Sequence, residues 1–102
     1  MLEDIKKELL KDPERIKELL GQFGYCNIAI RPTYIQFGRD ANSSKKSIVI
    51  RLENNSYLYV HDYARNINKD IFSYIATQRN LEFVDILNAT KKILNITDYY
   101  DF

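Results

Sequence analysis

Few side chains in this chain could act as a nucleophile or as a general base near neutral pH. It has one cysteine, Cys26, and one histidine, His61. A thiolate beside an imidazole can act as nucleophile and base, but such a pair also requires an oxyanion-stabilising group and a residue that orients the base. No pattern in the sequence supplies either group. We therefore predict no catalytic residues and no enzymatic activity for this chain by itself.

A metal site also lacks its usual ligands. With a single thiol there is no Cys-x-x-Cys pair and no internal disulfide. Cys26, Asp40, His61 and Asp62 include possible ligands, but His61 and Asp62 are adjacent on a predicted strand and so point to opposite faces. The three glycines are too few and too badly spaced for a phosphate-cradling loop. We predict no metal and no cofactor.

Basic and aromatic residues interleave in the middle of the chain. Tyrosines on strands can stack on unpaired bases, at about 1–3 kcal/mol per base, and nearby cations can contact phosphates. The formal charge is only +1, so binding would depend on a local patch. The candidate nucleic-acid-binding residues are Tyr34, Arg39, Lys45, Lys46, Arg51, Tyr57, Tyr59, Arg65 and Lys69. The alternative is that the lysines keep the surface solvated and the tyrosines pack with wet hydroxyls.

The N-terminal part, residues 1–22, predicts two helices that precede these candidates. Apolar residues recur at helical spacing in both segments. Asp12 can cap the second helix, and Pro13 suits its first position, where a missing N–H costs nothing. Gly21 would let the chain leave that helix in a left-handed conformation.

Residues 25–60 predict an antiparallel sheet of four or five short strands. Alternation of apolar and polar residues favours half-buried strands. Ile48 and Ile50 would lie on one face, with Val49 and Arg51 on the other. A polar loop over 38–46 separates the second and third strands, and an Asn-rich turn over 53–56 joins the last two.

The C-terminal part, residues 69–95, predicts two more helices, the first with Asp70 in its first turn and the second opened by residues 80–82. The acidic, aromatic tail over 96–102 is expected to fray. Helices, then strands, then helices indicate an α+β fold. We therefore predict one domain, residues 1–102, with a small antiparallel sheet flanked by N- and C-terminal helices.

A longer pattern runs from Tyr57 to Ile75. A Tyr-rich strand is followed by a polar turn and then by Asp70-Ile71-Phe72-Ser73-Tyr74-Ile75, and Leu81-Glu82-Phe83-Val84-Asp85-Ile86-Leu87 comes a few residues later. This order resembles the N-terminal zinc-binding domain of bacterial and phage DNA primases. In that family a strand ends in a Cys-x-x-Cys knuckle and the next helix opens with Asp-x-Phe-x-Phe-Ile. The resemblance covers roughly Ile16 to Leu94 and implies a zinc-ribbon-like fold.

The family's metal ligands are absent from this chain. By position, the knuckle cysteines would fall at Asp62 and Arg65, and the earlier Cys-Pro-x-His pair near residues 37–40. The resemblance therefore implies a degenerate zinc ribbon that has lost its metal, so that apolar packing must supply the folding free energy. The expected replacements are Phe37, Ile48, Ile50, Leu58, Val60, Phe72, Ile75, Phe83 and Leu87.

The resemblance implies a role in DNA replication. The chain would be a non-catalytic nucleic-acid-binding domain of, or related to, a DNA primase, and would engage single-stranded DNA template. It would be either the front piece of a longer primase or a stand-alone relative encoded by a phage or mobile element. Possible partners are the primase catalytic domain, a replicative helicase or a polymerase.

Two other functions stay open. One is a protein-interaction module that docks a helicase or polymerase without direct DNA binding, and the other is a small enzyme or inhibitor unconnected with replication. No apolar run approaches the ~20 residues of a membrane span. A single thiol and no secretory leader predict a cytoplasmic location.

Overall fold

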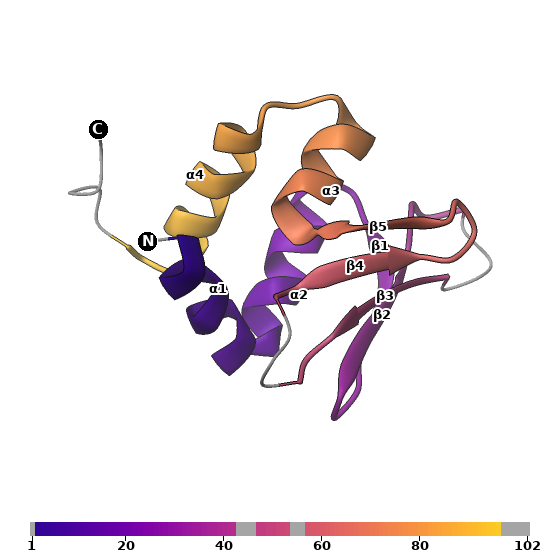
Figure 1. Cartoon of the computed structure of the whole chain (residues 1–102), viewed down its shortest axis with the longest axis horizontal. Coiled ribbons are helices and arrows are strands. Elements are labelled where there is room, and N and C mark those ends of the chain that lie inside the picture. The colour runs from indigo at the N-terminus through magenta and orange to yellow at the C-terminus, as the bar shows by residue number, and fades with distance from the viewer. Residues whose placement is uncertain (1, 43–46, 54–56, 97–102) are drawn as a thin grey trace.

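The computed structural model describes residues 2–42, 47–53 and 57–96 (Figure 1). These residues form four helices and five strands, in the α+β arrangement that the sequence predicts. In chain order the elements are α1 (Leu2–Lys11), α2 (Pro13–Gln22), β1 (Cys26–Ile30), β2 (Tyr34–Gly38), β3 (Ile48–Arg51), β4 (Tyr59–Asp62), β5 (Ile67–Asp70), α3 (Ile71–Arg79) and α4 (Phe83–Ile93).

The strands form one antiparallel sheet in the order β1-β2-β3-β4-β5, so each strand pairs with its neighbours in sequence. Ile35 lies opposite Ile50, and Ile50 lies opposite Val60. These three side chains are fully buried. The alternation in the sequence therefore predicts the buried face of β2, β3 and β4 correctly.

The sheet continues beyond the predicted end at residue 60. Residues 61–68 were expected to be strand end and turn, but Ile67–Asp70 form β5 and pair with β4. Asp70 ends β5 and caps α3: its Oδ1 accepts from the backbone N–H groups of Phe72 (3.0 Å) and Ser73 (3.2 Å). The first C-terminal helix therefore begins at Ile71 rather than at residue 69. Asp70 is its N-cap: the residue lies outside the helix, and its carboxylate accepts from N–H groups of the first turn.

Other predicted helix ends also differ from the structure. Asp12 makes no side-chain capping hydrogen bond, and Gly21 lies inside α2; the left-handed glycine is Gly24, at φ 89°. Asn80 takes the left-handed conformation that ends α3, so the last helix begins at Phe83 and not at residue 80. A capping box between Glu82 and Asp85 then starts α4.

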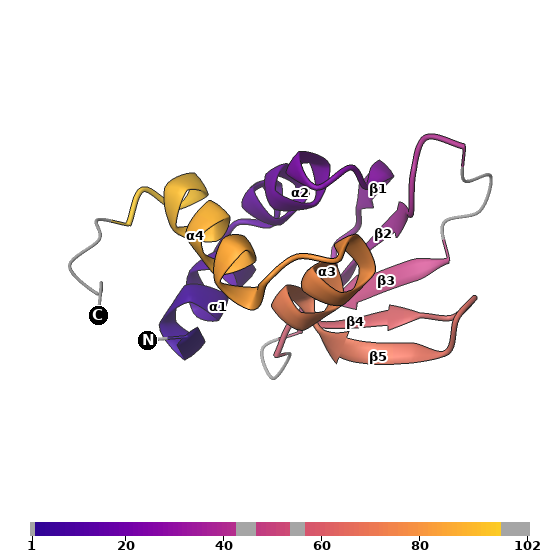
Figure 2. The same cartoon turned by 90° about the horizontal axis from the view of Figure 1, so that it is seen from above.

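The helices cover one side of the sheet and one end of it. Helix α3 packs against β4 and β5, α2 contacts β1, and α4 joins α2 to α3 (Figures 1 and 2). Most of the expected core residues are buried, but Leu87 is half-buried and Phe83 is exposed at the start of α4. The Phe83 ring meets the core residue Phe72 in an edge contact, at 5.9 Å between ring centroids. None of the helices in the described part of the chain has the length and hydropathy of a membrane span.

Candidate nucleic-acid interface

The face of the sheet opposite the buried one carries the candidate site. Side chains alternate across a strand, so the neighbours of the buried residues point the other way. This open face comprises Tyr34 and Gln36 of β2, Val49 and Arg51 of β3, and Tyr59 and His61 of β4. Arg51 and Tyr59 are exposed, and the other four residues are half-buried.

Two tyrosines and an arginine form a row across this face. Tyr34 pairs directly with Arg51, and the register between β3 and β4, continued by one residue, sets Tyr59 beside Arg51 on the other side. Strands lie about 4.8 Å apart, so the row is roughly 10 Å long. Arg51 Nη1 lies 3.7 Å from Glu53 Oε1 in an exposed ion pair. A cation between two rings can offer stacking and phosphate contact together.

The remaining candidates lie outside this row. Tyr57, just before β4, is highly exposed. Arg39 and Arg65 lie at the opposite end of the sheet, where β2 and β4 finish. Lys69 pairs with Val60 and so lies on the helix side, where its Nζ donates to Thr77 Oγ1 of α3 at 3.5 Å. Lys45 and Lys46 fall outside the described residues.

His61 and Tyr63 extend the open face but were not predicted as binding residues. His61 was weighed only as a metal ligand or a base, although its alternation with Tyr59 already places both on one face. The His61 and Tyr63 rings stack at 6.2 Å between centroids, with planes 19° apart. Tyr63 is 64% exposed and follows the end of β4, so the pair offers a second aromatic surface toward the other end of the open face.

The possible catalytic pair does not come together. Cys26 starts β1 and His61 lies on β4, with β2 and β3 between them, so they are roughly 14 Å apart across the sheet. The Cys26 thiol lies 3.5 Å from the carbonyl oxygen of Gly24 as a donor. In the described residues no three His, Cys, Asp or Glu side chains converge in a way that could hold a metal ion.

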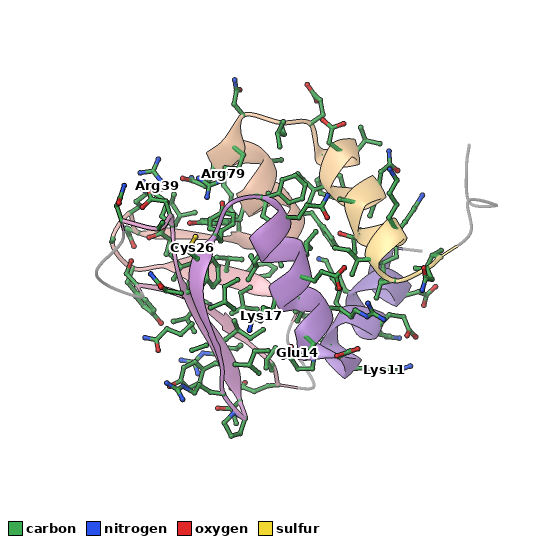
Figure 3. All side chains as sticks on the ribbon, turned by 180° about the vertical axis from the view of Figure 1, so that it is seen from behind. Lys11, Glu14, Lys17, Cys26, Arg39 and Arg79 are labelled. Atoms are coloured by element: carbon green, nitrogen blue, oxygen red, sulfur yellow. The ribbon has the colours of Figure 1, made fainter. Side chains whose placement is uncertain are left out.

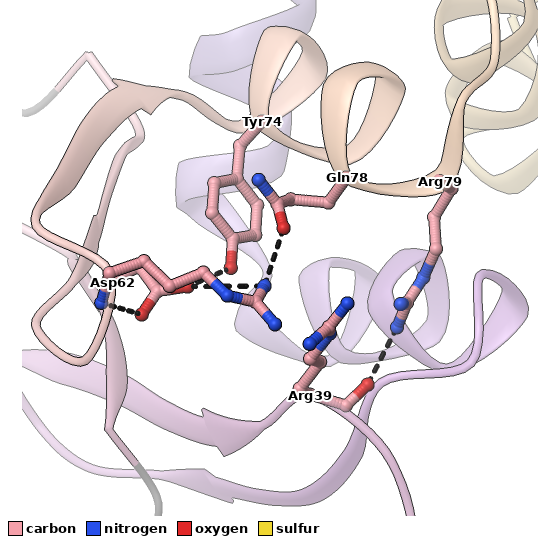
Figure 4. Close-up of polar contacts among 6 residues, drawn as sticks. Arg39, Asp62, Tyr74, Gln78 and Arg79 are labelled. Carbon is pink, nitrogen blue, oxygen red and sulfur yellow. Dashed lines mark hydrogen bonds and ion pairs between the residues drawn. The ribbon is translucent and has the colours of Figure 1, made fainter.

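A polar network occupies the end of the sheet where β4 finishes (Figure 4). Asp62 is only 3% exposed. Its Oδ2 accepts from the Tyr74 hydroxyl at 2.6 Å, and its Oδ1 accepts from the backbone N–H of Arg65 at 3.3 Å. Arg65 Nη1 lies 3.9 Å from Asp62 Oδ2 and donates to Gln78 Oε1 at 2.5 Å. The network supplies the partners that a buried carboxylate needs.

Burial and the bond to Asp62 raise the pKa of Tyr74 well above its usual range. The phenol therefore stays protonated and donates to Asp62 at every pH near neutrality. This bond ties α3 to the end of β4 across the core, since the two residues are 12 positions apart in the chain.

Arg79, the last residue of α3, joins three other parts of the chain. Its Nε donates to the Phe23 carbonyl at 2.8 Å and its Nη2 to the Arg39 carbonyl at 2.6 Å. Its guanidinium also lies 4.0 Å from the centre of the Tyr25 ring. Arg79 therefore holds together the end of α2, the start of β1 and the end of β2.

Searches of the chain against protein-family models, curated proteins and solved structures find no match. The class that the fold defines is a small α+β domain with a five-stranded antiparallel sheet flanked by helices. Its open face, with the row of Tyr34, Arg51 and Tyr59, is the candidate binding site.

Proposed function

We propose that the chain is a non-catalytic domain that binds single-stranded DNA on the open face of its sheet. The observation that carries this proposal is the row of Tyr34, Arg51 and Tyr59. A flat sheet can stack unpaired bases on its rings, whereas the bases of a duplex already stack on one another and present only their edges. The expected ligand is therefore a single strand.

The charge on the row is exposed to solvent. The ion pair between Arg51 and Glu53 is more than half exposed on both sides, and such pairs contribute about 0–1 kcal/mol. A backbone phosphate could replace Glu53 at little cost, and the counterions that it releases would add to affinity. His61 and Asn68, register partners on the open face, add hydrogen-bonding groups beside the row.

We further propose that the domain is a metal-free relative of the DNA primase zinc-binding domain and engages template in replication. Two observations support this relation. The order of helices and antiparallel strands agrees with the resemblance. The positions that it assigns to the ligand pairs, 37–40 and 62–65, also meet at one end of the sheet, because Phe37 and Asp62 both pair with Ile48. The polar network of Asp62 and the apolar core stabilise this end in place of a metal.

The direct test is the affinity for a labelled oligothymidylate, measured by fluorescence anisotropy as a function of salt. Tyr34→Ala and Tyr59→Ala should each weaken binding by about 1–3 kcal/mol, or roughly 5- to 150-fold, because each removes one stacking ring. Binding of the native chain should fall as salt rises, because phosphate contacts release counterions.

The control is Phe83→Ala. It removes an aromatic ring of similar exposure, 38% against 45% for Tyr59, but from the start of α4 rather than from the sheet. This variant should bind as the native chain does. If Tyr34→Ala and Tyr59→Ala bind no more weakly than Phe83→Ala, the open face is not the binding surface.

One observation favours a second function, docking of a replication protein without DNA contact. Leu81, Phe83 and Val84 are exposed at the turn into α4, on the side away from the open face. Exposed apolar residues that lie together are typical of protein contacts. If the chain binds no single strand at any salt concentration, and a helicase or polymerase binds it only while Phe83 and Val84 are present, this second function would replace the first.

A further inference from the structure

Three arginines from separate parts of the chain converge at the end of the sheet where β2 and β4 finish. Arg65 and Arg79 are linked through the end of α3, since Arg65 bonds to Gln78 and Arg79 follows Gln78. Arg79 in turn donates to the Arg39 carbonyl. Figures 3 and 4 both show the Arg39 side chain beside Arg79. We call these three residues the arginine cluster.

Positive charge in the arginine cluster exceeds the negative charge that faces it. Asp62 is the carboxylate paired with Arg65, so three guanidinium groups share one buried carboxylate. Asp40 follows Arg39 in the chain and is exposed, and its Oδ1 accepts from the backbone N–H of Asn42 at 3.0 Å; with its charge included, the sum remains positive. Like charges held together repel, and a bound anion would relieve that repulsion.

The cluster also holds donors without acceptors. Within residues 2–42, 47–53 and 57–96, no hydrogen bond or ion pair involves the Arg39 guanidinium, and the bonds of Arg79 use only Nε and Nη2. The Tyr25 hydroxyl is buried and likewise has no partner in this part of the chain. The Arg79 guanidinium lies 4.0 Å from the centre of this Tyr25 ring, so the hydroxyl belongs to a residue in contact with the cluster.

We propose that Arg39, Arg65 and Arg79 form a binding site for a phosphate monoester, as carried by a nucleotide or by the 5′ end of a strand. A monoester has a charge of about −1.5 to −2 at neutral pH, so three guanidinium groups attract it more strongly than the single charge of a backbone diester. Its three oxygens accept from guanidinium forks, which bind phosphate through paired N–H donors. The site lies at the opposite end of the sheet from Tyr34 and is independent of the proposed binding of DNA there.

Thymidine 5′-monophosphate is the probe, and thymidine is its control for contacts made by the base and sugar. Calorimetry on the full chain should detect binding of the monophosphate and little or none of thymidine. Arg39→Gln should weaken monophosphate binding about 10- to 100-fold, because a charged donor is lost. This variant should fold, because the Arg39 carbonyl that Arg79 uses is retained.

Lys17→Gln is the matched control, since it removes one positive charge from the exposed surface of α2 (Figure 3). Monophosphate binding should be unchanged in it. Arg65→Gln provides a second variant at the cluster and should also bind weakly. The proposal is overturned if the monophosphate binds no tighter than thymidine, or if Arg39→Gln and Arg65→Gln both bind as Lys17→Gln does.

A pair of oligothymidylates with a 5′-phosphate or a 5′-hydroxyl separates the two sources of the phosphate. Tighter binding of the phosphorylated strand, lost in Arg39→Gln, assigns the site to strand ends. Binding of the free monophosphate with no preference between the two strands assigns it to nucleotides. Since neither result depends on Tyr34 or Tyr59, failure of the DNA-binding proposal and failure of this one are separate outcomes.

Discussion

The two faces of the sheet use the same strands for different purposes. On the helix side, β2 and β3 contribute Ile35, Phe37, Ile48 and Ile50, all at most 2% exposed. On the open face, the alternate positions contribute Tyr34, Gln36, Val49 and Arg51, which keep contact with water. The buried face determines stability, whereas the open face keeps rings and a cation that packing does not need. Large aromatic side chains that remain exposed to solvent are therefore the best candidates for binding residues.

The largest expected effect is on the buried face. Phe37→Ala should lower the free energy of unfolding by about 3–5 kcal/mol, because it leaves a cavity beside the Tyr25 ring, which now meets Phe37 at 5.4 Å. Chemical denaturation measures this loss. The matched change on the open face, Tyr59→Ala, should cost less than about 1 kcal/mol. Equal losses from the two variants would mean that the faces do not differ as described.

The next effect is a loss of stability at alkaline pH. Burial raises the pKa of Tyr25 to about 12, although the positive charges of Arg79 and Arg39 lower it. Below about pH 10 the phenol is protonated in both states; between about pH 10 and 12 the unfolded chain releases a proton that the native chain keeps. Tyr25 should therefore lower the free energy of unfolding by roughly 2–3 kcal/mol over this range, and Tyr74, whose pKa is raised further, should add to the loss.

Tyr25→Phe checks the cause of that loss. It removes a hydroxyl that has no partner in the described residues, so it should fold normally and lose less stability as pH rises. Tyr59→Phe, on the open face, should lose stability as the native chain does. Denaturation at several pH values makes the comparison, and identical profiles for the two variants would contradict the assignment to Tyr25.

The smallest effect on stability is expected at Arg51. Arg51→Gln should change the free energy of unfolding by less than about 0.5 kcal/mol, since an exposed ion pair contributes little. In single-strand binding it should reduce the slope of log affinity against log salt by about 1, because one phosphate contact is lost. Arg15→Gln is the control: Arg15 also forms exposed ion pairs, with Asp12 and Glu18, but on α2. A slope changed equally by both variants would indicate a general charge effect.

The parts of the fold that could be predicted are those where burial repeats along the chain. Alternation predicts β2, β3 and β4, and the spacing of Ile16, Leu19 and Leu20 predicts α2, because each pattern reflects one apolar face. The strand β5 could not be found in this way. It is an edge strand of four residues, Ile67-Asn68-Lys69-Asp70, with no apolar alternation, and it is defined by its pairing with β4.

The candidate site could be predicted in part, because its residues also follow the alternation of buried and exposed positions along the strands. Tyr34, Arg51 and Tyr59 each alternate with buried neighbours, so a shared face follows once the strands are paired. Their order across the sheet was not predictable, because register depends on the turns and on contacts between strands. Lys69 lies on the helix side because this residue of β5 pairs with Val60 of β4. This position could not be predicted, because no sequence pattern indicates β5.

The sequence by itself determined the class of the fold, the buried face of the central strands and the interleaving of tyrosines with basic residues, because these follow from local periodicity. Only the tertiary structure decided which polar groups meet at the end of the sheet. Asp62 meets Tyr74 across the core, and Arg79 reaches the carbonyls of Phe23 and Arg39, 56 and 40 residues away. Such partners are chosen when separate elements pack together and each buried polar group must find a hydrogen bond, and no short sequence pattern records that choice.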